Sequence, residues 1–190
     1  MLTREDIIKI LEKTNSLKTG HFLLSSGLHS DKYVQCALVL SNPWEAEKLC
    51  KALAKKLEGL DIEVVVGPAL GGIVIAYELA RALNVPGMFA ERVENEMTLR
   101  RGFEIKPGQK VLVVEDVVTT GGSAKEVIKL IKEIGGEVVA VSSLIDRSGG
   151  KADFDVPFKA LLELEVPTYK AEDCPMCKGG STAEKPGSRK

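Results

Sequence analysis

Apolar residues fall into short runs along this chain, and these runs alternate with stretches of helical spacing. The runs at residues 62–66, 85–90, 111–114 and 137–145 have the length expected of buried strands. Between them, apolar side chains recur every three or four residues, as in Ile75, Leu79 and Leu83. Strands that alternate with helices through residues 62–145 predict an α/β fold with a parallel-sheet core and helices on both faces.

The flanking segments carry their own local signals. Thr3, with Asp6 three residues later, predicts a capped helix, and Asn42 before Pro43 predicts the start of another that runs to about residue 58. Two strand-like pieces around a Ser/Gly turn predict a small hairpin within residues 17–35. Residues 158–164 are a last strand candidate. The tail from Pro167 is rich in Gly, Pro and Lys, so we expect weak order unless it docks on the body.

Composition narrows the class of protein. Hydrophobic residues make up 44% of the 190 residues and charged residues 28%, with a net charge of −1. These are ordinary values for one globular domain, and the near-neutral balance argues against nucleic acid as the main partner. No apolar run reaches the length of a membrane span, and the N-terminus lacks the apolar core of a signal peptide, so the cytoplasm is the expected location.

The spacing of the cysteines and histidines does not assign a metal site to them. Only Cys174 and Cys177 form a C-x-x-C pair, and no second pair completes a four-ligand zinc site. A zinc shared across a dimer or a redox pair stays open, but reduced thiols in a surface tail are the favoured interpretation. His21 and His29 are expected to be solvated loop residues, because neither has a recognisable carboxylate or nucleophile partner in the sequence.

The most informative stretch is residues 111–123, VLVVEDVVTTGGS, and the helix that follows it. A buried strand leads to the adjacent acids Glu115 and Asp116 and then to a loop of hydroxyls and glycines. Glycines allow close approach to a ligand, and the first turn of a helix offers free N–H groups, so the loop suits a phosphate. The acids would repel a phosphate, so they must serve sugar hydroxyls or a bridging cation. The alternative is an ordinary strand before a capped helix; a Walker-type loop is excluded because no G-x-x-x-x-G-K-[ST] occurs.

Two acids followed by hydroxyls and glycines at a strand-to-helix turn resemble the phosphoribosyl-pyrophosphate (PRPP) motif of type I phosphoribosyltransferases. The resemblance implies that fold, with Glu115 and Asp116 on the ribose hydroxyls and Asp116 also in catalysis. It implies PRPP contacts along the rest of the motif: Val117, Val118, Thr119, Thr120, Gly121, Gly122 and Ser123.

A second glycine loop, Gly67–Gly72, also joins a strand to a helix, although a plain turn would leave the same pattern. In the family this loop grips the pyrophosphate, which implies contacts from Leu70 and Gly71 and a non-proline cis peptide near Ala69-Leu70. Bacterial relatives commonly have Lys at the position of Gly71, so here the backbone would make the contact.

The N-terminal stretch F-L-L-S-S-G followed by S-D-K-Y resembles the hood over the base in orotate phosphoribosyltransferases. The resemblance implies orotate contacts from Ser25, Tyr33, Thr119 and Arg147, although many members carry Lys in place of Ser25. Arg147 follows a strand end, where ligands bind in parallel sheets, and a guanidinium recognises a carboxylate bidentately. A surface salt bridge is the alternative role for Arg147.

Residues 93–106 are polar, lack a helical stripe and predict a flexible hairpin or flap. A mobile basic loop could neutralise departing pyrophosphate, and a solvated charged turn is the alternative. The family has a catalytic flap here that reaches into the neighbouring subunit, which implies a homodimer. Arg92 matches a PRPP-binding arginine at the base of the flap, and Arg100 or Arg101 would replace the usual lysine.

Taken together, the resemblance implies a glycosyltransferase of pyrimidine biosynthesis that uses orotate, PRPP and Mg²⁺, with no metal ligand directly assigned. Rival functions are a PRPP-dependent transferase for a purine base and a PRPP-sensing regulator without turnover. We expect one domain: a hood segment at 1–40, an α/β core at 41–165 and a C-terminal tail at 166–190.

Overall fold

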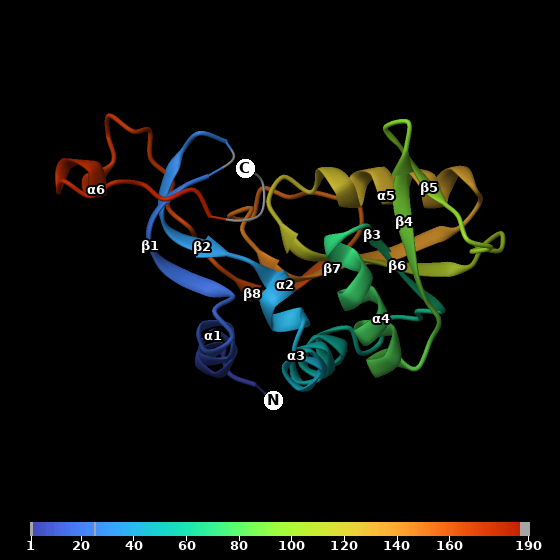
Figure 1. The fold of residues 1–190 in the computed structure, drawn as a ribbon. Helices are drawn as coiled ribbons and strands as arrows, with labels where there is room; N and C mark the ends of the chain where they lie inside the picture. The colour runs from blue at the N-terminus through green and yellow to red at the C-terminus, as the bar shows by residue number, and fades with distance from the viewer. Residues whose placement is uncertain (1, 25, 187–190) are drawn as a thin grey trace.

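The computed structural model describes residues 2–24 and 26–186, and a six-stranded sheet forms the centre of that part of the chain (Figure 1). The strands lie in the order β5–β4–β3–β6–β7–β8. All neighbours are parallel except β4 and β5, which form an antiparallel hairpin at one edge. The bounds of the strands are β3 Val64–Pro68, β4 Gly87–Val93, β5 Glu96–Leu99, β6 Lys110–Val118, β7 Glu137–Asp146 and β8 Phe158–Glu163.

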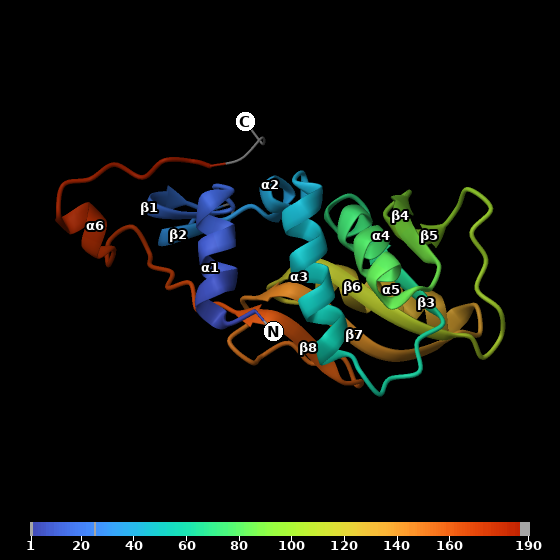
Figure 2. The same ribbon diagram turned by 90° about the horizontal axis from the view of Figure 1, so that it is seen from below.

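Helices cover both faces of this sheet, as the sequence predicts (Figures 1 and 2). The helices are α3 Pro43–Lys56, α4 Gly71–Leu83 and α5 Gly122–Glu133. Successive strand residues point to opposite faces. Val65 and Leu112 therefore pack in the cluster that holds α3 and α4, whereas Val64 and Val113 pack against α5 in a second cluster. The α/β core is confirmed, with one antiparallel edge strand added.

The N-terminal segment begins with α1 Arg4–Lys13, whose N-cap Thr3 forms the expected capping box with Asp6. The expected hairpin is β1 Leu17–Leu23 paired with β2 His29–Val34. A five-residue helix, α2 Cys36–Leu40, follows and was not predicted, because it is short and has no side-chain cap.

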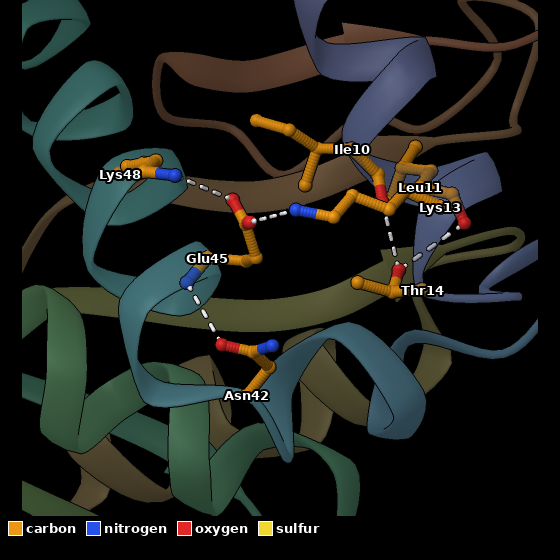
Figure 3. A network of polar contacts seen from close by, with 7 residues as sticks. All are labelled: Ile10, Leu11, Lys13, Thr14, Asn42, Glu45 and Lys48. Atoms are coloured by element: carbon orange, nitrogen blue, oxygen red, sulfur yellow. Dashed lines mark hydrogen bonds and ion pairs between the residues drawn. The ribbon is translucent and has the colours of Figure 1, made fainter.

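Helices α1 and α3 are joined by a polar network (Figure 3). Asn42 caps α3 by accepting a hydrogen bond from the Glu45 backbone, as predicted. The buried Glu45 carboxylate also accepts bonds from Lys13 of α1, at 3.3 Å, and Lys48, at 3.1 Å. A buried carboxylate needs such partners, and here they fix α1 against the start of α3.

The C-terminal tail docks on the hairpin and contains a short helix, α6 Pro175–Lys178. Tyr169 pairs with His29 along β2, and Glu184 pairs with Phe22 along β1. Figures 1 and 2 show α6 beyond the hairpin, at the end of the molecule opposite β4 and β5. Within the described residues, no helix is both long and apolar enough to cross a membrane.

Candidate active site

The loops that carry the predicted site follow β3, β6 and β7, three neighbouring parallel strands, so they meet at one edge of the sheet. From β3 the chain continues to β4 on one side, while β6 lies on the other side. This reversal between β3 and β6 is where open α/β sheets bind ligands. The loop after β3 approaches the end of β6 there: a Cβ added to Gly71 would lie 2.8 Å from the Asp116 Oδ1.

The loop after β6 has the geometry of an anion site. Gly121, the N-cap of α5, has a φ of +75°, and a Cβ there would lie 2.6 Å from the Phe154 ring, so glycine is required twice over. No side chain caps α5, and its first turn holds no acid. The first N–H groups of the helix are therefore left for a ligand.

The loop after β3 repeats this arrangement. Helix α4 starts after Leu70 without a side-chain cap or an acid in its first turn. The peptide bond between Ala69 and Leu70 is cis, as the resemblance implied. Leu70 is 83% exposed, and Gly71 faces the Asp116 carboxylate. A lysine at position 71 would crowd that carboxylate, which gives a physical reason for glycine here.

The paired acids at the end of β6 are held in a poorly solvated position. Burial, together with the charge of Asp116, raises the pKa of Glu115 to about 7, although Ser123 and Arg92 partly offset this effect. Burial also raises the pKa of Asp116, and the Val117 N–H limits the rise by donating a 2.9 Å hydrogen bond to Oδ1. Two half-buried carboxylates of this kind suit hydroxyl donors or a hard cation.

Arg92 is fixed by a partner that the sequence analysis did not identify. Its guanidinium donates bonds of 2.9 and 2.7 Å to the two carboxylate oxygens of Glu126 on α5. It also lies close enough to Glu115 for the charges to interact. This ion pair spans 34 positions in sequence and links the end of β4 to helix α5.

The predicted flap starts as the β4–β5 hairpin and continues as a loop through residue 109. Strand β4 runs on to Val93, three residues further than predicted, because it pairs with β5. Arg101 donates a 3.1 Å bond to Glu91 and lies over the Phe89 ring. Arg100 is exposed.

The residues predicted for the base line one cleft of about 910 Å³, in which Tyr33 of β2 lies with Thr119 and Arg147. The backbone N–H of Arg147 donates a 2.8 Å bond to the Val118 carbonyl, which ties this cleft to the end of β6. Among the described residues, the buried Arg147 Nε has no hydrogen-bond partner. Ser25, the fourth predicted residue, lies outside the described residues.

The tail also reaches this cleft, which the sequence analysis did not foresee. Val166, Thr168, Lys185 and Pro186 line it together with Ser148 and Lys151. Burial lowers the pKa of Arg147, so a ligand carboxylate would compensate a costly buried charge.

The histidines are not solvated loop residues, so that expectation is wrong; Cys174 and Cys177 are free thiols, as expected, but they are not exposed at the surface of the tail. His21 and His29 lie on paired strands rather than in solvated loops, and Cys174 is fully buried. The tail brings the two thiols to the two imidazoles, so that one ligand atom from each of the four lies within 4.8 Å of the others. Spacing could not reveal this, because Cys177 and His29 are 148 positions apart.

Comparisons with known proteins agree with this geometry. Residues 40–174 match the model of the phosphoribosyl transferase domain. The orotate phosphoribosyltransferase of Thermotoga maritima is 59% identical over 96% of this chain and 98% of its own. That of Caldanaerobacter subterraneus is 54% identical over the whole of both chains. The orotate phosphoribosyltransferase of Mycobacterium tuberculosis, solved in complex with inorganic phosphate, superposes with a TM-score of 0.71 at 27% identity, over 85% of this chain and 95% of that one.

The chain therefore belongs to the phosphoribosyltransferase family, in the group of the orotate phosphoribosyltransferases. The expected type I phosphoribosyltransferase fold is confirmed.

Proposed function

We propose that the protein transfers the ribose 5-phosphate group of PRPP to orotate, giving orotidine 5′-monophosphate and pyrophosphate in the synthesis of UMP. The observation that carries the proposal is the position of Arg147. Arg147 is half-buried, its buried Nε has no hydrogen-bond partner among the described residues, and it lines a cleft that also contains Thr119 and Thr120. This arrangement suits a base that carries a carboxylate, joined to a sugar phosphate.

In this proposal the two uncapped helix starts divide the phosphates of PRPP between them. The loop Thr119–Ser123 binds the 5-phosphate through the amides at the start of α5, while Leu70 and Gly71 bind the pyrophosphate through backbone groups. Val118 is buried, so it and Val117 contribute through the main chain. Arg92, oriented by Glu126, approaches from the flap and adds a positive charge to the pyrophosphate side.

Glu115 and Asp116 accept hydrogen bonds from the ribose hydroxyls. Their oxygens also fit Mg²⁺, a hard cation that prefers carboxylate and water ligands. Both carboxyl groups are half-buried and have raised pKa values, so their ionised forms require a positively charged partner. When bound, Mg²⁺ would offset the negative charge of the pyrophosphate.

The bond between ribose C1 and the pyrophosphate oxygen loosens to an oxocarbenium-like sugar, and N1 of orotate then attacks C1 while the N1 proton passes to the departing pyrophosphate or to water. The electron pair of the broken bond leaves with pyrophosphate, so the enzyme's share is positioning and charge stabilisation. We assign the charge stabilisation to Asp116, which contacts the ribose, and to Arg100 or Arg101 of the flap. Arg101 would have to leave Glu91 to take part.

A homodimer that shares the flap is part of the proposal. Among the described residues, most of the exposed large apolar side chains lie on or next to three mutually contacting helices, α2, α3 and α4: Leu38, Trp44, Leu70, Val74 and Tyr77. Such a patch on a folded chain is typical of a protein interface. Light scattering should give twice the chain mass, and a monomer would contradict this part. The cytoplasm stays the predicted location.

The proposal is tested with Arg147→Ala, using the change in orotate absorbance on addition of PRPP and Mg²⁺. The Michaelis constant for orotate should rise by roughly 10- to 100-fold, because a bond to a charged group is worth about 1.5–3 kcal/mol. The constant for PRPP should stay nearly unchanged. Arg81→Ala, in the last turn of α4, is the matched control.

Two outcomes of this assay would contradict the assignment. Turnover of adenine or a 6-oxopurine in place of orotate would assign a purine base. Binding of PRPP without turnover of any base would favour the regulator.

A further inference from the structure

We propose that the chain holds a structural Zn²⁺ between its C-terminal tail and the β1–β2 hairpin, bound by four side chains: His21, His29, Cys174 and Cys177. The histidines project from β1 and β2, and the cysteines flank the start of α6. Two thiolates and two imidazoles are a common ligand set for structural zinc, and a C-x-x-C pair is its usual spacing.

The distances between ligand atoms fit a tetrahedral site. The Cys174 and Cys177 sulfurs lie 3.5 and 3.7 Å from His21 Nε2, and the Cys177 sulfur lies 3.3 Å from His29 Nδ1. In a tetrahedral site, zinc bond lengths of about 2.3 Å to sulfur and about 2.0 Å to nitrogen place a sulfur ligand and a nitrogen ligand about 3.6 Å apart. The two imidazole nitrogens lie 2.8 Å apart and would separate by about half an ångström.

The surroundings of the cluster support a metal. The second ring nitrogen of His21, Nδ1, lies 2.6 Å from the Ser181 hydroxyl, the kind of outer contact that orients a metal-binding imidazole. His29 is fixed by two backbone bonds with Tyr169, of 2.8 and 2.9 Å. Cys174 is completely buried, and all four cysteines of the chain are free, so no disulfide occupies the thiols.

A metal here would fix the tail where it meets the substrate cleft. The residues on either side of the cluster pair with both strands of the hairpin, at Tyr169 and at Glu184. The next residues along the chain, Lys185 and Pro186, line the cleft that holds Arg147. The inferred zinc therefore positions tail residues at the base site without touching substrate.

The test is the zinc content of the full-length protein, purified without chelators and measured by plasma mass spectrometry. The wild type should contain about one zinc per chain, and Cys177→Ser should lower the ratio at least tenfold. Cys50→Ala removes a buried cysteine outside the cluster and should keep the metal. Equal zinc in the wild type and Cys177→Ser would identify an adventitious ion and overturn the site.

A second measurement uses the wild type alone and does not depend on a variant that folds. Replacement of zinc by Co²⁺ should give the strong visible absorption of a tetrahedral thiolate complex. A metal-free protein in which non-reducing peptide mass mapping finds a Cys174–Cys177 disulfide would overturn the proposal. Neither measurement involves turnover, so this inference and the proposed reaction can fail separately.

Discussion

Two pairs of helices in this chain begin in opposite ways. Helices α1 and α3 start with a side-chain cap, from Thr3 and Asn42, and with acids in their first turn. Helices α4 and α5 start with glycines, without a side-chain cap and without an acid. A missing cap costs a helix about 1 kcal/mol. Among the described helices of ten or more residues, only these two, at the edge of the sheet where the candidate site lies, begin without a side-chain cap, which supports the proposal that their free N–H groups bind anions.

The largest expected effect comes from filling one of the free helix starts. Gly121→Ala adds a Cβ against Phe154 and displaces the phosphate loop. We expect kcat/KM for PRPP to fall by about 100-fold or more in steady-state assays, because displacements of an ångström at a binding loop cost this much.

The matched control is Gly108→Ala. Gly108 has a similar φ of +73°, but a Cβ there meets nothing within 4 Å. Its variant should lose about 1 kcal/mol of stability and keep its activity. Equal activity losses in the two variants would show that backbone strain, and not the phosphate loop, is responsible.

A smaller effect is expected from the acid beside the free start of α5. Because the pKa of Glu115 in the folded protein, about 7, exceeds its ordinary value of 4.5, the folded state loses stability as pH rises between these values. Glu115→Gln removes that loss. In urea denaturation at pH 8 the variant should therefore be more stable than the wild type, by on the order of 1–2 kcal/mol, and equally stable at pH 4. Titration calorimetry should nevertheless show weaker PRPP binding.

Glu126→Gln should change the stability at pH 8 in the opposite direction. Arg92 lowers the pKa of Glu126, so its charge stabilises the fold at neutral pH and that contribution is lost on acidification. This variant should be less stable than the wild type at pH 8. A Glu115→Gln protein that is also less stable there would contradict the buried-acid interpretation.

The smallest effect is expected at a capped helix. Asn42→Ala removes the side chain that accepts from the Glu45 backbone. Thermal unfolding should show a loss of about 1 kcal/mol, while kcat and both Michaelis constants stay within error. A change in substrate affinity would contradict the proposal that capped helix starts contribute to stability and uncapped starts to substrate binding.

Much of the fold and site followed from local signals. The caps at Thr3 and Asn42 and the turn after β6 depend on residues adjacent in sequence, so a single stretch contained the information. The meeting of Thr119 with Arg147 followed from the rule that parallel strands end at one edge.

The missed features depend on distant partners. Glu126 fixes Arg92 across 34 positions. The imidazole–thiol cluster required the tail to fold back along the hairpin, whereas the local sequence of the tail predicted weak order unless it docked and did not indicate a docking site. Tertiary contacts, which no short window contains, decided each case.

The pairing of the tail with the β1–β2 hairpin has a consequence for handling the protein. An isolated two-stranded hairpin is marginal in water, and each bare edge is a template for pairing with other chains. In this chain Tyr169 and Glu184 occupy one edge each. A protein shortened before Pro167 would expose both edges at once, and it should aggregate through the hairpin even if its α/β core remains folded.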